Sequence, residues 1–193
     1  MQRFLHGRQQ RLAALLDSCN DAMRAYTAHQ LDIVATAGDF LGRASAAYEA
    51  LGDPDAESDM LALKAQLSSA RGGTHPMTLE RVTGHRRETE RSIVLHALVS
   101  SADRLRADYA ETRQSLAVAQ SQLVPILTVA AQRGLLSATA GGTLTQLELE
   151  QLWQALCADA EIRPAARQVA MTVSVTDVLL LLSDLLVAAA QPR

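Results

Sequence analysis

The densest group of side chains able to bind an anion lies between residues 81 and 91. This basic patch contains four arginines and one histidine, namely Arg81, His85, Arg86, Arg87 and Arg91. Guanidinium groups bind phosphates and carboxylates through paired, charge-assisted hydrogen bonds, so the patch is a candidate contact for an anion or an acidic partner. Glu88 and Glu90 interrupt it within the same helical turns, which favours a solvated, ion-paired face over a nucleic-acid interface.

None of the histidines or cysteines has the spacing of a metal or redox site. Carboxylate-bridged metal bundles need Glu-x-x-His pairs, and no histidine here has a glutamate three residues before it. Cys19 and Cys157 lie far apart in apolar helical patterns, which indicates buried free thiols. The sequence also lacks the phosphate-binding, dinucleotide-binding, nucleophile-elbow and zinc-protease motifs. We therefore expect no metal, no cofactor and no enzyme activity.

The segment from Ser137 to Glu148 resembles the calcium loop of EF-hand proteins in its spacing, with Gly142 at the sixth position and Glu148 at the twelfth. Calcium needs several carboxylate or carboxamide oxygens early in the loop, whereas serine, threonine and glycine stand there. We interpret the segment as a glycine C-cap and a turn between two helices. Thr143 and Gln146 have the spacing of a capping box for the helix that follows this turn.

The elements that carry these residues follow from a seven-residue apolar repeat. In the first fifty residues it comprises Leu5, Leu12, Cys19, Tyr26, Ile33, Phe40 and Ala47. An unbroken repeat of this period predicts a single long helix of about 45 residues. Gly52 marks its end, and Asp53 followed by Pro54 begins a short helix over about 54–70.

A second long helix is predicted by the same period after a flexible loop near 71–77. Its repeat comprises Leu95, Ala102, Tyr109, Leu116, Leu123 and Ala130. Pro125 lacks a backbone donor, so it predicts a kink or a break at 121–125. A fourth helix is expected over about 143–160. A fifth starts at Pro164 and continues to Ala189, and because it is apolar nearly all round it should be the central helix.

Together these patterns predict an all-α protein: one domain over 1–193, built as an antiparallel bundle of four to five helices with two long heptad-patterned helices. Hydrophobic residues make up 48% of the chain, which excludes intrinsic disorder. A net charge of −3 gives no overall attraction to nucleic acid. Because the sequence shows neither an export signal nor an apolar run long enough to cross a bilayer, we expect a cytoplasmic protein without a membrane partner. The excess of arginine over lysine suggests a bacterial source.

Long heptad-patterned helices favour a non-catalytic module for protein–protein interaction or oligomerisation, with a coiled-coil-like homodimer as the expected state. The expected interface residues are Leu5, Leu12, Leu16, Leu116 and Leu123. The alternative is a ligand-sensing or carrier bundle, with an apolar pocket between helices beside small residues such as Ala37 and Ala102. Trp153, the sole tryptophan, is expected to line the core or a pocket.

Overall fold

The computed structural model describes residues 4–74, 76, 86–136 and 144–190 of the chain. Within them 85% of the residues are helical and no β-strand occurs, so the predicted all-α class is confirmed. The chain divides into two compact units. We call Gln10–Ala110 the central unit, and Met1–Gln9 with Glu111–Arg193 the terminal unit. The single domain expected over 1–193 stays a prediction.

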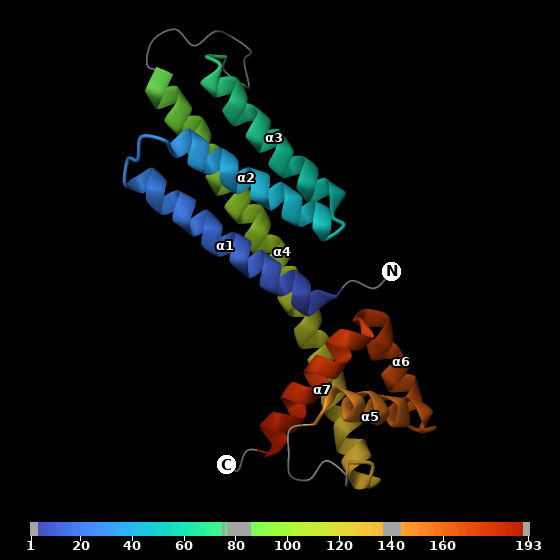
Figure 1. The fold of residues 1–193 in the computed structure, drawn as a ribbon. Helices are drawn as coiled ribbons and strands as arrows, with labels where there is room; N and C mark the ends of the chain where they lie inside the picture. Colours follow the sequence, from blue (N-terminus) through green and yellow to red (C-terminus); the bar gives the residue numbers. More distant parts are fainter. Residues whose placement is uncertain (1–3, 75, 77–85, 137–143, 191–193) are drawn as a thin grey trace. The chain divides into compact units, whose positions relative to one another are not determined.

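The central unit is built from four helical segments around one hydrophobic core. They are α1 (Leu5–Thr27) from Gln10 onward, α2 (Ile33–Ala50), α3 (Pro54–Arg71) and the first part of α4 (Arg86–Gln132), all labelled in Figure 1. Every one of these helices contributes buried side chains to the core, among them Leu12, Cys19, Phe40, Tyr48, Met60, Leu98 and Leu105.

The prediction of one long first helix from the heptad repeat is wrong, because the helix is interrupted between α1 and α2. His29 adopts a left-handed backbone conformation with φ 55°. Its N–H bonds the carbonyl of Tyr26, and the N–H of Gln30 bonds the carbonyl of Ala25. This pair of bonds is the Schellman motif that ends many helices, here formed without glycine. The seven-residue spacing runs across the break, so periodicity alone could not reveal it.

The end of α2 and the start of α3 agree with the sequence prediction. Gly52 has φ 65°, and the bonds around it form a second Schellman motif. The carboxylate of Asp53 then accepts a hydrogen bond from the backbone of Ala56, with Pro54 as the first residue of α3. The predicted N-cap and helix start are therefore confirmed. The flexible loop expected near 71–77 falls partly outside the described residues.

Helix α4 is continuous from Arg86 to Gln132 and contains Pro125 within it. The predicted alternative of a break at 121–125 is therefore wrong, while the kink stays a prediction. Gly134, with φ 72°, lies just after its end in a further Schellman motif.

The terminal unit contains the start of α1 up to Gln9 and the rest of α4, together with α5 (Gln146–Ala158), α6 (Arg163–Thr172) and α7 (Val175–Ala190). Their shared core includes Leu123, Ile126, Leu152, Leu156, Val169, Val178 and Leu182. The fifth helix predicted from Pro164 to Ala189 is in fact two helices, α6 and α7, which meet at a bend of 115°. Val173 is extended between them, since its β-branched side chain disfavours helix and Ser174 caps the start of α7.

The described residues therefore form seven helices, more than the four to five expected, because the predicted first and fifth helices are each interrupted. No single helix in the described ranges is long and apolar enough to cross a membrane, whereas the bent pair α6 and α7 passes that test when taken together.

Candidate functional site

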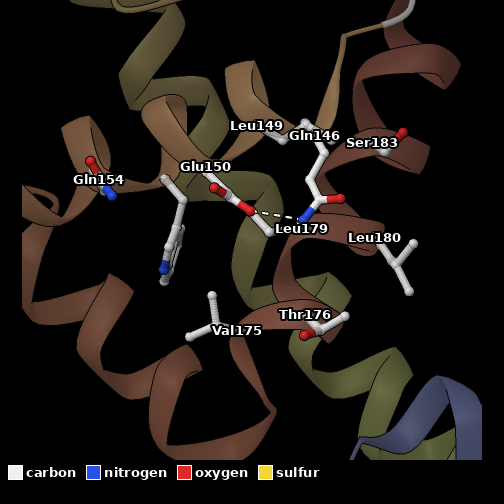
Figure 2. A pocket seen from close by; sticks show the side chains of 10 residues that line it. Gln146, Leu149, Glu150, Gln154, Val175, Thr176, Leu179, Leu180 and Ser183 are labelled. Carbon is white, nitrogen blue, oxygen red and sulfur yellow. Dashed lines mark hydrogen bonds between the residues drawn. The ribbon is translucent and has the colours of Figure 1, made fainter.

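An open groove lies between α5 and α7 in the terminal unit, and we call it the α5–α7 groove (Figure 2). Its volume is about 470 Å³, within the range of sites that hold small molecules or peptide side chains. The lining comes only from these two helices and consists of Gln146, Leu149, Glu150, Trp153, Gln154, Val175, Thr176, Leu179, Leu180 and Ser183.

Three buried apolar side chains line this groove: Leu149, Trp153 and Leu179. Val175 and Leu180 also line it but are 51% and 41% exposed. The polar lining is mostly uncharged, and its carboxylate, Glu150, accepts a 2.9 Å hydrogen bond from the amide of Gln146, drawn in Figure 2. The predicted place of Trp153 in a core or a pocket wall is confirmed. The groove itself presents apolar surface beside fixed hydrogen-bonding groups.

The start of α5 is fixed by a capping box between Thr145 and Glu148. The carboxylate of Glu148 accepts bonds from the backbone N–H of Thr145, at 2.7 Å, and from its hydroxyl, at 2.8 Å. These bonds, the backbone one first, lower the pKa of Glu148 below its ordinary value. The predicted capping box of Thr143 and Gln146 is wrong, since Gln146 is already the first helical residue. Residues 137–143 of the calcium-like segment lie outside the described residues.

The start of α7 is fixed by Asp177, whose side chain is fully buried. Ser174 caps the helix: its hydroxyl donates to this carboxylate at 2.6 Å and accepts from the N–H of Asp177 at 3.2 Å. The same carboxylate accepts the backbone N–H groups of Leu5 and His6, both at 2.9 Å. The His6 ring Nδ1 also lies 2.8 Å from it. One acid thus joins the first turns of α1 and α7.

Two opposing influences act on the pKa of Asp177. Burial is the largest single influence and raises the pKa. The hydrogen bonds from Ser174, His6 and Leu5 together outweigh burial, so the pKa lies below its ordinary value. The carboxylate is therefore charged at neutral pH. Its bond to Ser174 fixes the start of α7, directly before the groove residues Val175 and Thr176.

The leucines expected to form an interface do not line the α5–α7 groove. Leu12, Leu116 and Leu123 are buried in the cores, and Leu5 and Leu16 are half-buried against them. Their apolar surface is therefore used in packing within the chain. The alanines expected beside a pocket, such as Ala37 and Ala102, are likewise buried in the core of the central unit.

Three residues of the basic patch are described, while Arg81 and His85 lie outside the described residues. Arg86 pairs with Glu90 at 2.9 Å, as the predicted ion-paired face requires. The guanidinium of Arg91 stacks over the Tyr26 ring, 4.6 Å from its centroid, and Arg87 is exposed. The structure adds a feature that the sequence did not reveal, because the α1–α2 turn lies beside these arginines.

The metal-binding side chains do not cluster in the described parts of the chain. No group of three His, Cys, Asp or Glu side chains there could hold a metal ion. Both cysteines are free thiols. Cys19 is buried and Cys157 half-buried, and burial raises the pKa of each. Their thiolates are therefore disfavoured at neutral pH.

Comparisons with protein families, with characterised proteins and with solved structures gave no match for this chain.

Proposed function

We propose that the chain is a non-catalytic interaction module whose α5–α7 groove binds an apolar helical segment of a partner protein. The observation that carries this proposal is the groove itself, which places the buried Trp153 beside the exposed Val175 and Leu180. Exposed apolar side chains gathered around a hollow are typical of interaction sites. We propose in addition that the helices pack antiparallel with heptad patterning, as the sequence predicts. Helices of this kind present rows of apolar side chains to one another.

The spacing of the exposed residues suits a helical partner. On α7, Leu180, Ser183 and Val187 succeed one another at intervals of three and four residues, which places them in one row. On α5, Leu147 lies three residues before Glu150 and is also exposed. A partner helix that presents apolar residues one turn apart would match these two rows, as in other helix-in-groove complexes.

The charges around the groove indicate the chemistry of the partner. Glu150 lines the groove, and the exposed Asp184 comes directly after the lining residue Ser183. Acidic groups at the edge of an interface favour a partner of opposite charge and slow the approach of an acidic one. The proposed partner segment is therefore an amphipathic helix with lysine or arginine beside its apolar face.

A second copy of the chain is the second candidate partner, because the exposed row of Leu180 and Val187 would also be covered in a homodimer. A two-fold contact places the same surface on both sides. Such a contact would bring the acidic groups Glu150 and Asp184 of both copies into one interface, which opposes association. Light scattering after size exclusion separates the two: a dimer has twice the chain mass of 20.7 kDa.

Calorimetric titration with model peptides tests the proposal. The probes are two helical peptides of equal length, with one leucine face and either lysines or glutamates elsewhere. We expect saturable binding of the lysine peptide and much weaker binding of the glutamate peptide. Leu180→Asn should weaken the lysine peptide about tenfold, since a lost apolar side chain contributes roughly 1–2 kcal/mol.

The matched control is Leu61→Asn on α3, because Leu61 is 46% exposed, close to the value for Leu180, and lies in the central unit. This variant should bind the lysine peptide as the wild type does. Equal weakening by both substitutions, or no binding of the lysine peptide, would overturn the proposal. Binding of a neutral apolar dye without any peptide binding would instead favour a small-molecule carrier.

A further inference from the structure

A second hollow lies in the central unit, where the α1–α2 turn meets the first turns of α4. Its volume is about 230 Å³, and its polar lining comes from His29, Gln30, Arg87, Glu90 and Arg91. It shares no residue with the α5–α7 groove. The hollow is therefore a separate place at which a ligand of different chemistry could bind.

The charges of this hollow favour an anion. Glu90, the carboxylate in the lining, is neutralised by Arg86 at 2.9 Å. Arg87 and Arg91 lie four residues apart on α4, so their like charges face the same side of the helix and repel one another. An anion between them would relieve this repulsion and accept hydrogen bonds from both guanidinium groups.

The geometry around Arg91 holds one of these groups in place before any ligand arrives. Its guanidinium stacks over the Tyr26 ring at 4.6 Å, and its Nη2 donates to the Tyr26 carbonyl at 3.3 Å. An arginine has five N–H donors, so these contacts leave others for a ligand. Tyr26 belongs to the helix end that His29 closes, and the same turn thus positions Arg91 and forms the opposite wall.

We propose that this hollow is a binding site for a phosphate monoester or free phosphate, held by Arg87 and Arg91. The small volume suits one such group with a short organic substituent. The paired arginines supply the bidentate donors that tetrahedral and planar oxyanions accept, which a single lysine does not.

Calorimetric titration with inorganic phosphate tests the site, with chloride used to keep the ionic strength constant. We expect saturable binding to the wild type and at least about tenfold weaker binding to Arg87→Gln and to Arg91→Lys, because charge-assisted bonds are lost in each. The Arg91→Lys variant keeps the charge and removes the paired donors. Arg106→Gln, at an exposed arginine further along α4, is the control and should bind as the wild type does.

A second titration with glycerol 3-phosphate distinguishes the source of the phosphate group. Tighter binding than inorganic phosphate would identify an organic phosphomonoester as the ligand, and weaker binding would identify free phosphate. Either result supports the site. The proposal is overturned if phosphate gives no saturable heat, or if Arg87→Gln and Arg91→Lys bind it as tightly as Arg106→Gln does.

Discussion

The hydroxyl of Tyr48 donates a 2.6 Å hydrogen bond to the carboxylate of Asp108, and both side chains are buried. Arg104 binds the same carboxylate at 3.1 Å and also reaches Asp59 at 2.9 Å. One network of polar side chains thus connects α2, α3 and α4 inside the central unit. Because the acid stays paired with Arg104, loss of Tyr48 alone does not leave its charge uncompensated.

Tyr48→Phe should therefore lower the free energy of unfolding by about 2 kcal/mol, the size expected for a hydrogen bond to a charged group. Urea denaturation measures this change. Tyr109→Phe, at a half-buried tyrosine of α4, is the control and should change stability by less than about 1 kcal/mol. Equal effects of the two substitutions would show that the bond to Asp108 contributes nothing beyond the phenol itself.

Asp177→Asn tests the connection between the first turns of α1 and α7. An amide has one acceptor oxygen and no charge, so it cannot replace all the bonds from Ser174, Leu5 and His6. We expect a loss of about 2 kcal/mol in the free energy of unfolding. Asp184→Asn, an exposed site on the same helix, should stay within about 0.5 kcal/mol of the wild type. If the two variants are equally stable, the buried carboxylate does not hold these turns.

The stability supplied by Asp177 should also depend on pH. Its pKa is lower in the folded chain than the ordinary 3.8, so the unfolded state takes up protons first as the pH falls. The contribution is complete above pH 3.8 and is lost as the pH falls through the lower, folded value. Thermal melts from about pH 6 to about pH 2.5 should show the gap between wild type and Asp177→Asn closing in that window. A gap of constant size would contradict the lowered pKa.

His29→Gly should stabilise the chain by roughly 0.5 kcal/mol. A left-handed conformation costs a non-glycine residue about 1–2 kcal/mol, and glycine removes this cost. Part of the resulting stabilisation is lost, because glycine has more conformational freedom in the unfolded chain. The same substitution at the exposed His96, inside α4, should destabilise by about 0.5 kcal/mol. Urea denaturation of both variants decides the matter, and effects of the same sign would refute the strain assigned to His29.

The helix ends show how far the sequence could predict this fold. Gly52 and the Asp53-Pro54 step carry recognisable signals, and the structure has the expected boundary there. The turn at His29 and the bend at Val173 lack glycine and proline, and the apolar pattern continues across both. The apolar periodicity therefore contains no sign of these breaks, and the local signals at the second one, the β-branched Val173 and the N-cap Ser174, are weaker than glycine or proline.

The α5–α7 groove could be predicted only in part. The sequence predicts Trp153 in a core or a pocket wall because Leu149, Leu152 and Leu156 lie near it. The opposite wall comes from residues 175–183, which the sequence assigned to the middle of one buried helix. Since the groove is lined jointly by α5 and α7, which lie apart in the sequence, no pattern within either helix could reveal it.

The fluorescence of Trp153 tests the central claim most directly, because it is the only tryptophan in the chain and lines the α5–α7 groove. The lysine peptide, made without aromatic residues, should change the emission in a saturable way, and Leu180→Asn should shift the midpoint about tenfold to higher concentration. Leu61→Asn should leave the midpoint unchanged. An emission spectrum that does not respond to the peptide, or responds alike in both variants, would contradict the assignment of the groove as the binding site.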